Sequence, residues 1–199
     1  GHGVSAFEGV EGAFVLGPSA IVTGPVTSKL YEHWTYQRST IEVIYSVYAS
    51  LPYVYIELLV HWHEDRKILK LELQPAKRCG ASLMMQAAGG AIQRRANGLE
   101  LPLHQWVWLP MNEGNLAIIQ EGAFACDYTQ DRLRLTLVRS SLYGYDRHTS
   151  LNPIDPQNLT DQGEHRFRLC IFTAPDCHSA QFDQLAQAFV EPYLVIREG

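Results

Sequence analysis

Apolar and polar residues alternate with a period of two along most of this chain, and this pattern constrains the fold more than any other feature. The clearest case spans residues 132–138, where leucines occupy every second position and Arg132, Arg134 and Thr136 lie between them. Such alternation is typical of a strand with one buried and one solvated face, so we expect this strand at the surface of a sandwich. Comparable patterns predict at least eight strands, at residues 19–26, 41–48, 53–60, 68–73, 105–109, 116–119, 132–138 and 165–172.

Short polar segments at residues 64–67 and 129–131 separate consecutive strands and suit tight antiparallel turns. One helix is predicted at residues 179–190, where apolar residues recur at helical spacing before Pro192. The predicted fold is therefore an all-β, antiparallel β-sandwich with one short C-terminal helix, forming a single domain over residues 1–199. Three longer segments are rich in Gly, Pro, Asn and Asp and are expected to be irregular, at residues 74–80, 87–104 and 140–160.

Charge and hydrophobicity exclude some classes of partner. The formal net charge is −5, and no Lys/Arg cluster forms the basic surface that a phosphate backbone requires, so we expect no nucleic-acid partner. No run of about 18 apolar residues is present, so we expect no membrane span. With 46% hydrophobic and 19% charged residues, the composition is that of an ordinary globular protein.

Four cysteines are present, at positions 79, 126, 170 and 177, and none shows C-x-x-C spacing. The absence of C-x-x-C spacing disfavours both a zinc knuckle and a thioredoxin-type redox pair. We therefore expect buried or idle thiols in a reducing compartment, which predicts a cytoplasmic location.

Two histidines alternate with a tryptophan at His61-Trp62-His63, which places both imidazoles on one face of a strand. This spacing occurs in metal sites of some β-barrels, and Glu64 is a candidate third ligand. A metal site needs a further ligand from elsewhere in the chain, and no second H-x-H or H-x-x-x-H motif supports one. Structural histidines are therefore the favoured interpretation, with His61 and His63 as metal ligands of an enzyme kept as the alternative.

No catalytic residue is predicted. Cys177-His178 beside Asp176 resembles a nucleophile with a base and an orienting carboxylate, but no nucleophile motif such as G-x-S-x-G accompanies it. The carboxylate pairs available for sugar hydrolysis are sequence neighbours in turn-like segments. We interpret both pairs as solvated turn residues: Glu64 with Asp65, and Asp161 with Glu164.

Two pairs of residues are candidates for binding a sugar. Arg94 and Arg95 lie in a glycine-flanked segment and offer rigid donor forks to sugar hydroxyls or to a carboxylate of a partner domain; solvated arginines are the alternative. Trp106 and Trp108 share a face and could form a platform on which a sugar ring stacks. Core tryptophans are the favoured interpretation of the second pair.

Six short motifs follow one another along the chain and cover most of residues 24–172. They read GPV at 24–26, WHEDRKILKL at 62–71, GAIQR at 90–94, ELPLHQW at 100–106, RLRLTLVR at 132–139 and DQGEHRF at 161–167. In their order and spacing these motifs resemble the C-terminal β-sandwich region of glycoside hydrolase family 38 α-mannosidases, and they are most similar to the bacterial or cytosolic branch of that family.

The resemblance implies a mutarotase-like sandwich that forms the C-terminal part of a larger, multidomain, retaining α-mannosidase. It also implies that zinc and the catalytic aspartate belong to an N-terminal catalytic domain, so this chain should hold no cofactor and should be inactive alone. The implied partners are that catalytic domain and mannose-containing glycans. In some members an arginine reaches the active-site entrance, and Arg94 or Arg95 matches its motif. The alternative is a free-standing carbohydrate-binding module.

Overall fold

The computed structural model describes residues 9–76, 79–112, 114–129, 132–141, 159–176 and 178–191. The described residues form thirteen strands and one helix. The strands are β1 (Val15–Thr23), β2 (Thr27–Tyr36), β3 (Ser39–Tyr48), β4 (Leu51–Trp62), β5 (Ile68–Leu73), β6 (Ser82–Ala87), β7 (Gly90–Arg95), β8 (Leu101–Pro102), β9 (Trp106–Pro110), β10 (Asn115–Glu121), β11 (Ala125–Thr129), β12 (Arg132–Arg139) and β13 (Gly163–Ala174), and the helix is α1 (Ser179–Val190).

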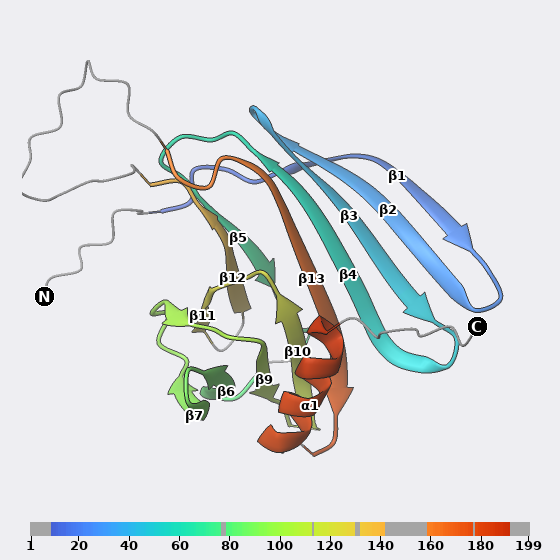
Figure 1. The fold of residues 1–199 in the computed structure, drawn as a ribbon, viewed down its shortest axis with the longest axis vertical. Coiled ribbons are helices and arrows are strands. Elements are labelled where there is room, and N and C mark those ends of the chain that lie inside the picture. The colour runs from blue at the N-terminus through green and yellow to red at the C-terminus, as the bar shows by residue number, and fades with distance from the viewer. Residues whose placement is uncertain are drawn as a thin grey trace, which may run out of the picture.

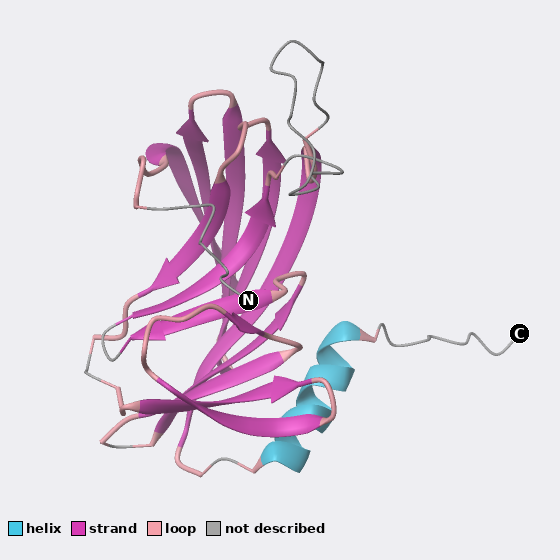
Figure 2. Cartoon of the chain, turned by 90° about the vertical axis from the view of Figure 1, so that its left-hand side faces the viewer, coloured by secondary structure: helices cyan, strands magenta, loops and turns pink. Residues whose placement is uncertain are grey.

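Two antiparallel sheets pack against each other (Figures 1 and 2). The larger sheet has the order β1-β2-β3-β4-β13-β10-β9-β6-β7, and the smaller sheet has the order β5-β12-β11-β8. All pairings between the described strands are antiparallel. The predicted all-β sandwich with one short C-terminal helix is therefore confirmed.

The middle of the larger sheet is covered on both faces. Opposed residues share a face in an antiparallel ladder, so Leu58 and Phe167 point together toward the smaller sheet and contribute to the main core. Tyr55 and Cys170 are also opposed, and they point to the other face, which α1 covers. The second core lies beneath this helix and contains Trp106, Trp108, Ala117, Ile119, Cys170, Phe182 and Ala186.

Packing holds α1 on the sheet. No side chain caps its first turn, and its first and last turns carry no charges that complement the helix dipole. Its buried residues are Phe182 and Ala186, one turn apart on a single face. The Phe182 ring lies 5.5 Å from the Trp106 ring and 5.0 Å from the Trp108 ring, measured between centroids. In the described part of the chain no helix is long and apolar enough to cross a membrane.

Most strand predictions are confirmed, and residues 68–73 and the helix at 179–190 are confirmed at both ends. The prediction at 19–26 was wrong in one respect, because Gly24 begins a turn that ends β1 and its N–H donates to the Thr27 carbonyl over 2.9 Å. The segment 87–104 is not wholly irregular, since it contains β7 and β8. Most of the predicted loop at 140–160 lies outside the described residues. The strands not predicted are β2, β6, β7, β8 and β11.

The outer face of β12 is less solvated than the alternation predicted. Asp127 on β11 is only 2% exposed and accepts hydrogen bonds from Lys70 Nζ and Arg134 Nε, each over 2.6 Å. Thr136 is fully buried and donates to Glu100. The pKa of Glu100 is lowered: burial raises it, but the hydrogen bond from Thr136 and the nearby Lys70 outweigh that effect. Charged side chains therefore pair with one another across this face and shield Asp127 and Thr136 from water.

We predict that Phe182→Ala lowers the free energy of unfolding by about 3–5 kcal/mol, because it removes the ring that fills the space between α1 and the sheet. Urea denaturation followed by circular dichroism measures this change. Gln184→Ala is the matched control, since Gln184 lies on the exposed side of the same helix. An equal, small effect of the two substitutions would show that α1 contributes little to stability.

Candidate functional site

The two arginines singled out from the sequence lie at the end of the β6–β7 hairpin, on an edge strand of the larger sheet. The turn of this hairpin needs glycine, because Gly89 and Gly90 have φ values of +95° and +133°. Arg94 is opposite Leu83 and Arg95 is opposite Ser82, so the two side chains point to opposite faces of the sheet. They therefore cannot both contact a ligand on one face.

Both arginines are exposed, and neither forms an ion pair with a residue of the described segments. On the face of Arg95, Gln93 donates a hydrogen bond to Ser82 Oγ over 3.0 Å, so these polar groups satisfy each other. Arg94 shares its face with Leu83, which is 1% exposed and belongs to the main core. Each guanidinium is thus exposed and has no described ion-pair partner, so an external oxygen ligand can reach its donors.

Trp106 and Trp108 do share a face, but that face lies beneath α1. Trp106 is fully buried, Trp108 is 9% exposed, and their rings stack with centroids 5.1 Å apart. The Trp106 indole donates to Asp183 Oδ1 over 2.7 Å. A sugar platform must present an aromatic face to solvent, so the platform interpretation of this pair is wrong and the core interpretation fits the structure.

The carboxylate of Glu64 is buried in the protein. Its Oε1 accepts hydrogen bonds from the backbone N–H of Arg38 over 3.0 Å and from Ser39 Oγ over 2.8 Å. Glu64 is 1% exposed, whereas the side chain of Asp65 is 62% exposed. The interpretation of Glu64 as a solvated turn residue was therefore wrong, because the β2–β3 turn supplies buried donors that the local sequence does not reveal.

The two histidines have separate surroundings. His61 is half-buried on β4, opposite Thr40 and Glu164, while His63 follows the strand and is exposed. The backbone N–H of His63 donates to Ser39 Oγ over 2.9 Å. Among the residues that the structure describes, no three His, Cys, Asp or Glu side chains gather in a group that could hold a metal ion.

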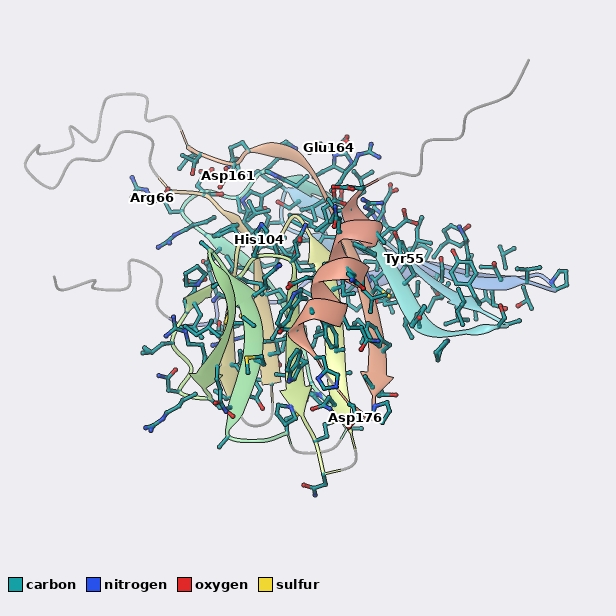
Figure 3. All side chains as sticks on the ribbon, turned by 60° about the horizontal axis from the view of Figure 1, so that its bottom comes forward. Tyr55, Arg66, His104, Asp161, Glu164 and Asp176 are labelled. Atoms are coloured by element: carbon teal, nitrogen blue, oxygen red, sulfur yellow. The ribbon has the colours of Figure 1, made fainter. Side chains whose placement is uncertain are left out.

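The remaining acidic candidates lie at opposite ends of β13, with Asp161 and Glu164 at its start and Asp176 beyond its end. Asp161 and Glu164 precede and begin β13, are exposed, and Glu164 pairs with Arg166 over 2.9 Å. Figure 3 shows Asp176 well away from both, beyond the other end of β13. Cys177 lies outside the described residues, so the Asp176–Cys177–His178 grouping stays a sequence-based hypothesis. Both side chains are solvated, as predicted, but only Asp161 lies in a turn, because Glu164 belongs to β13 and is paired with His61 of β4.

The described cysteines, at positions 79, 126 and 170, are buried and form no disulfide with one another. Burial raises the pKa of the Cys126 thiol to about 12 and that of Cys170 to about 11. Burial also raises the pKa of Cys79. A thiol reacts as its thiolate, so these three side chains are idle in the folded protein, as the sequence predicted.

The structure contains one polar depression that the sequence did not predict. It has a volume of about 300 Å³ and lies between α1 and the strands β6 and β9, where it is lined by Gln86, Gln105, Asp183, Gln187, Val190 and Glu191. Gln86 organises its floor: it donates to Asp183 Oδ1 over 2.8 Å and accepts from the Gln105 N–H over 3.1 Å. The depression exists only because α1 returns to the sheet, and no local motif announces that contact. His104, labelled in Figure 3, contacts the same glutamine over 2.9 Å.

The two packed antiparallel sheets define a β-sandwich domain. Its exposed arginines lie on an edge strand of the larger sheet. A family model described as glycosyl hydrolases family 38 C-terminal domain matches residues 17–157, and the chain belongs to this family. The expected resemblance to the C-terminal region of family 38 α-mannosidases is thereby confirmed.

Relatives and solved structures agree with this assignment. Alpha-mannosidase 2C1 of Mus musculus and that of Homo sapiens are each 27% identical to the chain over an alignment of 138 residues, which covers 65% of this chain but only 12% of those proteins. An alpha-mannosidase from Enterococcus faecalis V583 superposes with a TM-score of 0.69 at 11% identity, over 88% of this chain and 24% of that one. A glycosyl hydrolase family 38 protein from Enterococcus faecalis gives 0.70 at 12% identity, with the same coverage. At these identities the superpositions establish the shared fold.

We predict that Glu64→Ala lowers the free energy of unfolding by about 1–3 kcal/mol, because the Arg38 N–H and the Ser39 hydroxyl lose their buried acceptor. Asp65→Ala is the control, and it removes only an exposed ion pair, worth about 1 kcal/mol or less. Chemical denaturation of both variants measures the difference. Equal stability of the two would mean that the buried carboxylate is dispensable.

Proposed function

We propose that this chain is the non-catalytic C-terminal domain of a retaining α-mannosidase that removes terminal α-mannosyl residues. The observation that carries the proposal is the family match over residues 17–157. The names of the relatives support it, and so does their length, since the matched region forms 12% of each. In this proposal the chain supports a catalytic domain in the same polypeptide, which supplies the carboxylates and holds the zinc ion.

Within that enzyme, we assign to Arg94 or Arg95 the role of lining the substrate entrance. Exposure, a rigid edge strand and the lack of a described ion-pair partner support this role. A guanidinium presents several N–H donors in a plane and binds vicinal hydroxyls or a carboxylate in two-point fashion. Because the two arginines point to opposite faces, only one of them contacts the glycan and the other faces solvent or the catalytic domain.

The proposal predicts that the isolated 199-residue chain does not hydrolyse an aryl α-mannoside, even with added zinc. Hydrolysis that is lost in a His61→Ala/His63→Ala variant would overturn the proposal and establish a metal site on the sandwich.

Calorimetric titration with methyl α-mannoside tests whether the isolated chain binds sugar. Saturable binding by the isolated chain would favour a free-standing carbohydrate-binding module.

In a full-length α-mannosidase that carries this chain as its C-terminal domain, we predict that one of Arg94→Ala and Arg95→Ala lowers kcat/KM by about 10- to 100-fold. This loss corresponds to about 1.4–2.7 kcal/mol of transition-state stabilisation. The other substitution should have little effect. Arg38→Ala is the control, since Arg38 is also exposed but lies in the β2–β3 turn. Unchanged kinetics in both variants would remove the arginines from the substrate entrance.

A further inference from the structure

The bend that follows β7 contains the only Asn-Gly pair of the sequence, Asn97-Gly98. An asparagine before glycine is prone to lose its side-chain amide, because the next backbone nitrogen can reach the carboxamide carbon and glycine has no Cβ to obstruct it. Each of the other four asparagines precedes a residue with a side chain. The reaction takes place within one chain and consumes only water, so it requires no partner.

A hydrogen bond holds the Asn97 side chain beside the peptide group that would attack it. Asn97 Oδ1 accepts from the backbone N–H of Leu99 over 3.1 Å, which keeps the carboxamide close to the Gly98 peptide. Attack on the carboxamide places negative charge on this oxygen, and the Leu99 N–H is already directed at it. In the described part of the chain Asn97 Nδ2 forms no hydrogen bond, so nothing there retains the leaving nitrogen.

One contact opposes the reaction. The Gly98 N–H donates to the Tyr128 carbonyl over 2.9 Å, and this hydrogen bond must open before the nitrogen can lose its proton. The bond lies beyond the pairing of β8 with β11, which involves only two residues of each strand. It can therefore open locally, without disruption of a strand ladder.

We propose that Asn97 is a site of spontaneous deamidation in the folded chain. The Gly98 nitrogen loses its proton and attacks Asn97 Cγ, the new C–N bond closes a cyclic imide, and ammonia leaves. Water then adds to one carbonyl carbon of the imide and breaks its bond to nitrogen. Hydrolysis at the former side chain gives aspartate, and hydrolysis at the main-chain carbonyl gives isoaspartate. Each conversion consumes one water and releases one ammonia, with no change of oxidation state.

The modification changes the charge beside an arginine of the candidate site. Either product adds one negative charge, two residues after Arg95, to a chain whose formal net charge is −5. Isoaspartate also lengthens the main chain by one carbon between β7 and β8. The edge strand that carries Arg95 therefore acquires, with time, a neighbouring carboxylate that the newly made chain lacks. The inference does not depend on the mannosidase function.

Incubation of the folded chain at neutral and mildly alkaline pH, followed by peptide mass spectrometry, tests the proposal. Asn97 should convert to aspartate and isoaspartate at a rate proportional to hydroxide concentration, because the attacking nitrogen must lose its proton. Asn115 is the internal control, since it lies in the same tryptic peptide, precedes leucine, and donates from Nδ2 to the Ala174 carbonyl over 3.3 Å. It should keep its amide over the same period, while circular dichroism verifies that the chain stays folded.

Gly98→Ala should slow the conversion of Asn97 by about 10- to 100-fold, because a methyl group obstructs the nitrogen and misplaced reacting atoms lose rate on this scale. The variant has room for its Cβ, whose nearest neighbour would be Thr129 Cγ2 at 3.6 Å. Asn97→Gln keeps a carboxamide at this exposed position and should remove the isoaspartate, which enzymatic methylation of isoaspartyl groups detects.

Three results would contradict the proposal. Asn97 could stay intact in the folded chain, or react no faster than Asn115. Gly98→Ala could react as fast as the wild-type chain. An isoaspartate signal that persists in Asn97→Gln would place the modification at another residue.

Discussion

The ladder between β4 and β13 organises the whole domain, because it lies at the middle of the larger sheet and contributes side chains to both cores. Leu58 and Phe167 face the smaller sheet, while Tyr55 and Cys170 face α1. Strand geometry turns successive residues to opposite faces, so a shift of one residue would exchange the two sets. Burial of both faces therefore fixes the register of these strands, and the outer strands add to a sheet whose alignment is already set.

Buried charges specify the alignment of other strands at two further places. Glu64 connects the end of β4 to Ser39 at the start of β3, and Asp127 connects β11 to Lys70 on β5 and Arg134 on β12. Each carboxylate is almost inaccessible and has two or more donors, so its desolvation is compensated only when the strands are correctly aligned. Polar contacts of this kind discriminate against misaligned pairings more than they add to overall stability.

The sequence predicts most of the sheet because alternation is strong wherever one face is buried, as at residues 68–73, and weak where both faces are partly solvated, as in β2. It does not predict the candidate site as well. The spacing of Trp106 and Trp108 shows that they share a face, but only the long-range contact with α1 shows that this face is covered. The partners of Glu64 lie about 25 residues away, so its burial also depends on the tertiary fold.

The stacked tryptophans give the two cores separate optical signals. Of the four tryptophans in the chain, Trp62 lies in the core between the sheets and Trp34 packs against that core, while Trp106 and Trp108 stack at an interplanar angle of 5° beneath α1. Closely stacked indoles couple their electronic transitions, whereas a single indole gives an uncoupled spectrum. Detachment of the helix would abolish the coupled signal and expose two indoles to water, while the emission of Trp62 would persist until the sheets themselves separate.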